Sequence, residues 1–138
     1  MPDTERVMVD IETIGLETGS VIASIGAVRF DADGLGDTFK QSVSIASCQA
    51  AGLTIAAETI EWWFDQDETA REQLTGGADL EDALFEFSNW YHGADEIWAN
   101  SPSFDCEMLE AAYDAVDADP PWEFYEERDF RTIASLPV

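Results

Sequence analysis

Two apolar segments that end in acidic residues constrain the fold of this chain most strongly. The first is Val7–Thr13, in which Asp10 and Glu12 alternate with apolar residues. Because successive side chains of a β-strand point to opposite faces, both carboxylates should lie on one face of a sheet. The second segment, Ile97–Asp105, is an apolar run followed by a turn. If the two strands are neighbours, Asp105 joins the other carboxylates at one sheet edge, which predicts a divalent-metal hydrolase.

Acidic residues are too abundant here for the Asp-x-Glu spacing alone to carry that hypothesis. Asp and Glu make up 30 of the 138 residues, and random placement at this frequency gives about six acid-x-acid patterns. The strand context and the second segment therefore carry the argument. The alternative interpretation is that Asp10 and Glu12 form a solvated strand end, and that Asp105 is an acid in the first turn of a helix, where the helix dipole favours it.

Both segments resemble the motifs of the DEDD 3'-5' exonucleases of the ribonuclease H-like superfamily. Asp10-Ile11-Glu12-Thr13 is similar to the first motif of that family, and Asn100 followed by Phe104-Asp105 is similar to the second. Three further stretches resemble its exonuclease VIII-like and mycobacterial-type 3'-5' exoribonuclease branch: Ile25-Gly26-Ala27-Val28, Thr59-Ile60-x-Trp62-Trp63 and Arg128-Asp129-x-Arg131-Thr132. The resemblance runs from about Val7 to Leu136.

The resemblance implies an α/β fold of the ribonuclease H-like type in a single domain, 1–138. Its mixed sheet would contain a three-strand antiparallel meander and a parallel strand, flanked by helices. The implied cofactors are two Mg²⁺ or Mn²⁺ ions, with Asp10 bridging both, Glu12 binding one and approaching the terminal 3'-hydroxyl, and Asp105 binding the other. The implied partner is single-stranded or 3'-ended DNA or RNA. Its candidate contacts are Thr13, Asn100, Phe104, Arg128 and Arg131.

The resemblance also implies a closing segment that this sequence does not contain. In the family, a final helix with a His and a fourth metal-binding Asp follows the segment that resembles Arg128–Thr132, whereas this sequence ends at Val138. Asp129 is a poor substitute because it aligns with the turn before that helix. The sole histidine, His92, precedes Asn100 and is interpreted as a helix cap. The sequence therefore predicts a C-terminally incomplete domain without the closing helix.

Three interpretations of this difference stay open. The chain is an exonuclease domain that has lost its catalytic helix, or a natural module that binds nucleic-acid ends or a partner protein without turnover, or one half of a site that a homodimer or a second chain completes. The first two differ in activity. The third predicts association, because the absent helix would otherwise cover apolar sheet surface.

The net charge of −24, with only six Lys and Arg, argues by itself against a nucleic-acid partner, because phosphate affinity rests largely on basic side chains. The same composition is typical of a protein adapted to near-saturating salt, where screening acts over about 3 Å or less. We therefore expect the source to be a halophilic archaeon or a virus of one. Divalent cations would then bridge protein carboxylates to substrate phosphates.

Other features predict a soluble, cytoplasmic protein, in the host cytoplasm if it is viral. No apolar run approaches the ~20 residues that a membrane span needs, and no signal peptide opens the chain. Cys48 and Cys106 lack metal-type spacing and are interpreted as two reduced thiols. A hydrophobic share of 46% is enough for one packed core.

Turn-forming residues and hydrophobic periodicity predict the order of the secondary-structure elements. Strands are expected at Arg6–Ile11, Val21–Asp31, Thr38–Ile45 and Glu96–Ala99. Helices are expected at Glu58–Phe64, Leu80–Tyr91 and Phe104–Ala115. Turns are expected at Gly15–Gly19 and Asp33–Gly36. Trp62, Trp63 and Phe64 are interpreted as core residues, with stacking on a terminal base as the alternative.

Overall fold

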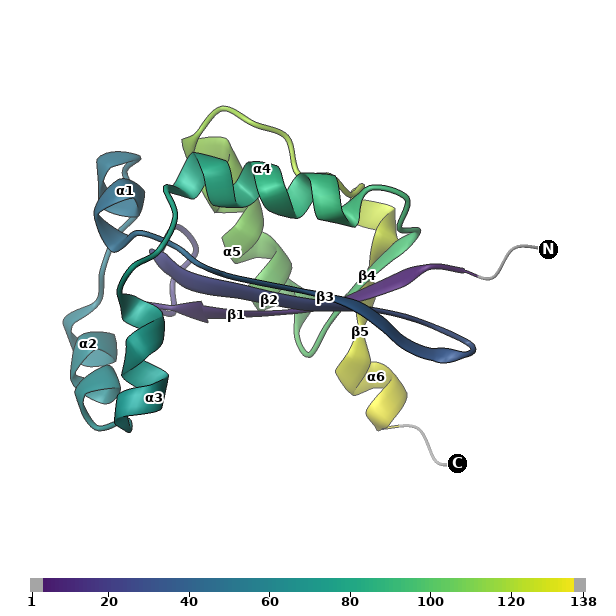
Figure 1. Cartoon of the computed structure of the whole chain (residues 1–138), viewed down its shortest axis with the longest axis horizontal. Helices are drawn as coiled ribbons and strands as arrows, with labels where there is room; N and C mark the ends of the chain where they lie inside the picture. The colour runs from purple at the N-terminus through teal and green to yellow at the C-terminus, as the bar shows by residue number, and fades with distance from the viewer. Residues whose placement is uncertain (1–3, 136–138) are drawn as a thin grey trace.

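A five-stranded mixed sheet forms the centre of the structure, a computed structural model that describes residues 4–135 (Figure 1). Leu136, where the predicted resemblance ends, lies outside the described residues, and so does the last residue, Val138. The strands are β1 (Arg6–Thr13), β2 (Ile22–Asp31), β3 (Gly34–Ser42), β4 (Glu96–Ala99) and β5 (Glu127–Asp129). Their order is β3-β2-β1-β4-β5, with β1 antiparallel to β2, β2 antiparallel to β3, β4 parallel to β1 and β5 parallel to β4. The predicted meander with a parallel addition is confirmed.

Two long helices, α4 (Leu80–Tyr91) and α5 (Pro102–Ala115), cover one face of the sheet (Figure 1). The shorter helices are α1 (Ile45–Ala50), α2 (Ala57–Phe64), α3 (Glu68–Arg71) and α6 (Phe130–Ala134), with 3₁₀ turns η1 (Glu72–Leu74) and η2 (Phe124–Glu126). α2 and α3 lie at one end of the sheet, and α6 follows β5 at the other. None of these described helices combines the length and apolarity needed to span a lipid bilayer.

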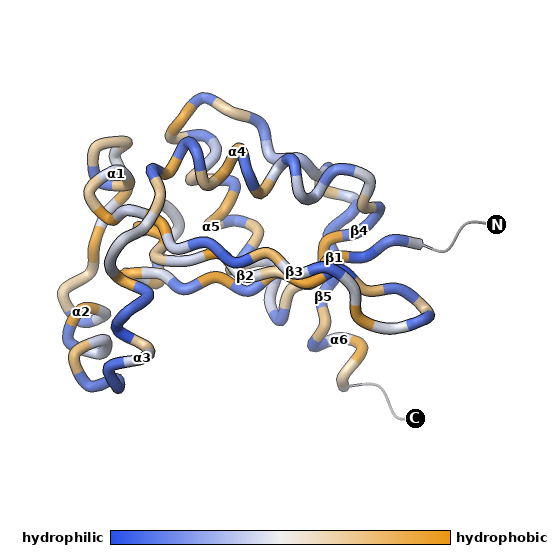
Figure 2. The backbone as a smooth tube through the Cα atoms, viewed as in Figure 1, coloured by the Kyte–Doolittle hydropathy of each residue, from blue (hydrophilic) through white to orange (hydrophobic). Residues whose placement is uncertain are grey.

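The hydrophobic core lies between the sheet and the α4–α5 layer. Val7, Val9 and Ile11 of β1 are almost fully buried there, as are Phe87 of α4 and Met108 of α5. Along α4 the hydropathy changes repeatedly between hydrophilic and hydrophobic, as expected of a helix with one buried side (Figure 2). The other face of the sheet carries the even-numbered residues of β1, and we call it the open face.

Several predicted boundaries differ from the structure: β1 continues to Thr13 rather than Ile11, and α5 begins at Pro102 rather than Phe104. The largest differences are at the two ends of β3, where the turn expected at Asp33–Gly36 lies mostly within the strand. The strand begins at Gly34 rather than Thr38, because the hairpin is closed by a tighter turn in which the Asp31 carboxylate accepts the Asp33 N–H at 2.8 Å. It ends before Ile45, which instead begins α1, because Ser44 caps that helix. The helices α1, α3 and α6, the strand β5 and both 3₁₀ turns were not predicted, since segments of three to six residues are too short to show a hydrophobic period.

Gly77 packs directly against the backbone that follows β3. A Cβ at this position would lie 2.4 Å from the carbonyl carbon of Val43 and 2.6 Å from the nitrogen of Ser44. The neighbouring Ala78 pairs with Val43 in an isolated bridge, and its carbonyl accepts the Ser44 N–H at 2.7 Å. The absence of a side chain at Gly77 therefore allows the segment before α4 to join the sheet.

We expect Gly77→Ala to lower the free energy of unfolding by about 1–3 kcal/mol, because backbone atoms must move to admit the methyl group. Denaturant unfolding of both variants measures the effect. Gly36→Ala is the matched control, because its Cβ would meet its nearest neighbour, the carbonyl oxygen of Arg29, at an ordinary 3.6 Å. Equal stabilities of the two variants would contradict this account of the packing.

Candidate active site

Three carboxylates gather where β1 ends and α5 begins. Asp10 is exposed and Glu12 is half-buried on the open face of β1, alternating with buried neighbours as the sequence predicts. Asp105 lies in the first turn of α5 and is only 6% exposed. One Asp105 carboxylate oxygen accepts the backbone N–H of Ile11 at 3.3 Å. This bond joins the first turn of the helix to the strand between the two other carboxylates.

The electrostatics of the site show that the three carboxylates are close enough to repel one another. The pKa of Asp105 is raised to about 6, chiefly by burial and also by the charges of Asp10 and Glu12, against the opposing effect of the Ile11 N–H. The pKa of Glu12 is also raised, first by burial and then by Asp10. A negative charge on each group is therefore unfavourable unless a cation offsets it.

The donor chemistry fits a hard divalent cation, although the side chains are not arranged around one. Within residues 4–135, no three His, Cys, Asp or Glu side chains are close enough together to hold a metal ion as they stand. Carboxylate oxygens are nevertheless the ligands that Mg²⁺ and Mn²⁺ prefer. A cation would also relieve the repulsion that raises the pKa of Asp105. The residues fit the implied metal in type and electrostatics, and binding it requires side-chain movement.

A cavity of about 820 Å³ opens beside Glu12. Glu12 and the predicted substrate contacts Thr13 and Phe104 line it. The remaining lining residues come from β1, the loop after it, the segment before α2, and α2 itself: Ile11, Leu16, Glu17, Ser20, Thr54, Ile55, Ala56, Glu58, Thr59 and Trp62. The cavity combines apolar walls with hydroxyl and carboxylate groups. A pocket of this size and character can hold a small polar organic ligand.

The aromatic residues of α2 divide between the core and this cavity. Trp63 is 3% exposed, and its indole N–H donates to the Thr13 carbonyl at 3.1 Å, so the core prediction was right for this residue. It was wrong for Trp62, which is 52% exposed and lines the cavity, and for Phe64, which is 70% exposed. Successive helical residues point about 100° apart, so a run of three aromatics cannot share one buried side.

The remaining predicted substrate contacts are Asn100, Arg128 and Arg131, and only the first and the last lie next to the turn before α5. Asn100 is exposed immediately after β4, close in sequence to the start of α5. Arg131 donates to the Ser101 hydroxyl at 3.1 Å, so its guanidinium is next to that same turn. Arg128 is held differently: it pairs with Glu96 at 3.5 Å and donates to the Tyr125 carbonyl.

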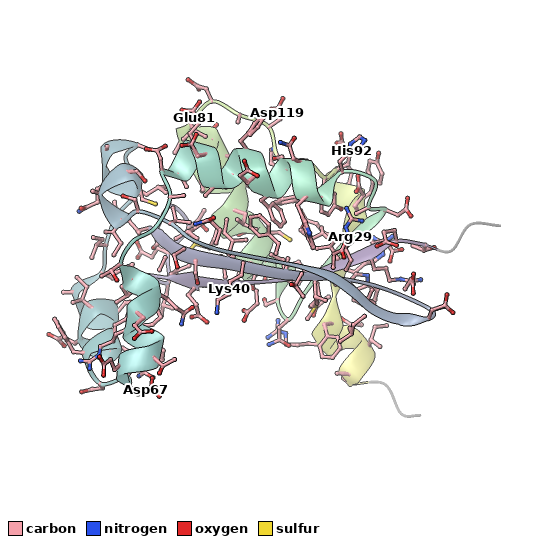
Figure 3. All side chains as sticks on the ribbon, viewed as in Figure 1. Arg29, Lys40, Asp67, Glu81, His92 and Asp119 are labelled. Carbon is pink, nitrogen blue, oxygen red and sulfur yellow. The ribbon has the colours of Figure 1, made fainter. Side chains whose placement is uncertain are left out.

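His92 and Asp129 are both engaged in structural roles. His92 is the C-cap residue of α4, and its carbonyl accepts a bond from Arg29 at 2.8 Å (Figure 3). Arg29 also pairs with Glu5, so this contact lies at the opposite end of β1 from Asp10. The Asp129 carboxylate accepts the Arg131 N–H at 2.8 Å and caps α6. These positions agree with the interpretation of His92 as a cap and of Asp129 as a turn residue.

An apolar groove of about 540 Å³ crosses the open face beyond Asp10. Its floor includes Met8 and Trp98, and its sides come from the β2–β3 hairpin and α6. The full lining is Arg6, Met8, Val28, Phe30, Asp31, Leu35, Trp98, Phe130 and Ile133. Leu35 is 82% exposed, which places a large apolar side chain in solvent at the edge of the groove.

Comparisons with known proteins agree with this geometry. Residues 5–137 match the 3'-5' exoribonuclease Rv2179c-like domain family. No curated protein matches the chain. Among solved structures, a product-bound exonuclease I has a TM-score of 0.74 at 14% identity, covering 96% of this chain and 31% of its own. E. coli exonuclease I with an oligonucleotide gives a TM-score of 0.73 at 13% identity, covering 95% and 29%. This chain thus spans about a third of the length of these exonucleases, and the likeness establishes the ribonuclease H-like fold.

The raised pKa of Asp105 makes a prediction about stability. Because the folded-state pKa of about 6 exceeds the ordinary 3.8, the folded chain holds a proton more tightly, and stability falls as pH rises from about 4 to 6. Asp105→Asn removes this penalty and keeps an oxygen for the Ile11 N–H. We expect it to raise the free energy of unfolding at pH 7 without metal by about 1–3 kcal/mol, and to make little difference below about pH 4.

Thermal or denaturant unfolding at several pH values, at fixed salt, measures this effect. Asp114→Asn is the control, because Asp114 is an exposed acid on the same helix. An Asp105→Asn protein that is less stable than the parent at pH 7 would show that the charged Asp105 carboxylate does not destabilise the folded state.

Proposed function

Because this chain belongs to the Rv2179c-like 3'-5' exoribonuclease domain family, we propose that it removes nucleotides from the 3' end of single-stranded nucleic acid with the help of two divalent cations. The observation that carries the proposal is the meeting of Asp10, Glu12 and Asp105 at one sheet edge, beside a cavity of about 820 Å³. A structure of E. coli exonuclease I with single-stranded DNA in a zinc-bound form supports a divalent cation in this fold. We propose Mg²⁺ or Mn²⁺ here.

Each carboxylate has a proposed role. Asp10, exposed on the open face, would bridge the two cations, Glu12 would hold one of them, and Asp105 would hold the other. The cations would supply a hydroxide nucleophile and stabilise the leaving oxygen. The Ile11 N–H holds one oxygen of Asp105, and the other oxygen would bind the cation. A substrate in the cavity would present its last phosphodiester to these groups.

The cavity would hold the terminal nucleoside. Trp62, Phe104 and Leu16 supply apolar surface from three different segments, which suits the faces of a base. The Thr13 hydroxyl already donates to the Gly15 carbonyl at 2.6 Å, so Thr13 would contribute shape rather than a free donor. Asn100 and Arg131, at the turn before α5, would contact the strand that enters the site.

The groove on the open face supports a further partner. It lies on the same side of the sheet as Asp10, and the apolar side chains of Leu35, Phe130 and Ile133 are 46% or more exposed along it. Exposed apolar surface of this kind is typical of an interface. We propose that a second copy of this chain or another protein covers the groove, and that this partner is where a further metal ligand would be found.

We expect this chain to shorten a 5'-labelled single-stranded oligonucleotide from its 3' end in molar KCl with Mn²⁺. Asp10→Ala and Asp105→Asn should each reduce the rate at least 100-fold, because removing a ligand weakens cation binding at the reacting phosphate. A denaturing gel of the product ladder measures the rate. Asp114→Asn, with the same change of charge on the exposed side of α5, should leave the rate unchanged.

Two results would contradict this proposal in different ways. If the folded chain binds the oligonucleotide in a Mn²⁺-dependent manner without cleaving it, the chain is a binding module. If all four proteins cleave at the same rate, the activity comes from a contaminant. RNA and DNA oligonucleotides of one sequence should be compared in parallel to identify the substrate.

We expect the chain to self-associate as its concentration rises, because the groove leaves apolar side chains in solvent. Ile133→Glu should raise the dissociation constant at least tenfold by placing a charge in the interface. Sedimentation velocity in high salt measures the association. Phe124→Glu is the control, since Phe124 is 81% exposed but does not line the groove. A parent protein that stays monomeric at all concentrations would exclude a second copy as the partner.

A further inference from the structure

Lys40, the only lysine of the chain, lies in line with Asp10 across the sheet. The register pairs Asp10 of β1 with Gly26 of β2, and Gly26 with Lys40 of β3. Residues that are paired across neighbouring strands present their side chains on the same face. Lys40 therefore belongs to the open face, and Figure 3 shows it on the side of the sheet away from α4.

Gly26 leaves the space between these two side chains free. Neighbouring strands lie about 4.8 Å apart, so the Cα atoms of Asp10 and Lys40 are about 10 Å apart across the glycine. The flexible four-carbon stem of a lysine can cover most of that distance. The Lys40 ammonium can therefore reach an anion that is bound next to Asp10.

Lys40 differs from most basic residues of this chain because it has no acidic partner among the described residues. Four of its five arginines pair with carboxylates, in the pairs Arg6–Glu96, Arg29–Glu5, Arg128–Glu96 and Arg131–Asp129. Within residues 4–135, neither Lys40 nor Arg71 forms such a pair. The neighbours of Lys40 on the open face of β3 are the uncharged Thr38 and Ser42. In a chain of net charge −24, a cation without a carboxylate partner among the described residues thus lies in register with Asp10 on the same face of the sheet.

We propose that Lys40 is a substrate-binding residue that holds a backbone phosphate of the nucleic acid at the Asp10 site. The inference rests on the proposed function and adds a phosphate contact that the sequence motifs do not contain. Lysine binds phosphate as a point charge with three donors. The cations at the carboxylates and the ammonium of Lys40 would approach the phosphate from two sides.

Steady-state kinetics test this role with matched variants. Lys40→Met should raise KM for a single-stranded oligonucleotide about tenfold, the effect of one hydrogen bond to a charged group, and leave kcat within about twofold. Lys40→Arg should restore most of the affinity. Arg71→Met, which removes the other unpaired cation from exposed α3, should change neither constant. Equal effects of Lys40→Met and Arg71→Met, or no effect of either, would overturn the proposal.

A binding experiment separates this proposal from the proposed activity. With Mn²⁺ present, adenosine 5'-monophosphate should bind the parent protein more tightly than adenosine, and Lys40→Met should remove most of that difference while Arg71→Met keeps it. This result without any cleavage would support the phosphate-binding role of Lys40 and contradict the exonuclease activity. Cleavage that does not depend on Lys40, or nucleotide binding with no preference for the phosphate, would refute the role of Lys40.

Discussion

The bond from the Ile11 N–H to the Asp105 carboxylate is the contact on which the site depends. It is buried, and it ties the first turn of α5 to the strand that carries Asp10 and Glu12. Without it, an ionised Asp105 in this position would lack its one backbone donor from β1, and the raised pKa shows that burial already disfavours its charge. The fold thus holds three like charges together. A cation is the ligand that gains most from such an arrangement.

A chain of net charge −24 can bind a polyanion if its positive charge is local. At high ionic strength the long-range repulsion is screened within a few ångströms, whereas contacts at bonding distance persist. The described surface offers two places for local positive charge: carboxylates that would hold divalent cations, and Lys40 in line with Asp10. The apolar walls of the cavity would hold the uncharged base. The remaining acids would then serve solubility and take no part in binding.

Local patterns made part of this structure predictable. The alternation around Asp10 and Glu12 fixed their common face, and the apolar period of α4 fixed its buried side. Trp62 was misassigned because its neighbour Trp63 has the same residue type but points into the core. The position of Lys40 had no local signal at all, since it follows from the register of two successive strand pairs. The groove was foreseeable only in outline, because β5 and α6 are too short to leave a pattern.

The carboxylate site and the apolar groove share the open face, and this makes their ligands interdependent. Met8 lines the groove, and Asp10 is the next residue on the same side of β1. A partner that covers the groove would exclude water near Asp10 and strengthen the attraction between the carboxylates and a cation. Linkage then requires the reciprocal effect: a bound cation must increase the affinity for that partner by the same factor. Metal binding and coverage of the groove would therefore act as one cooperative step in forming the active site.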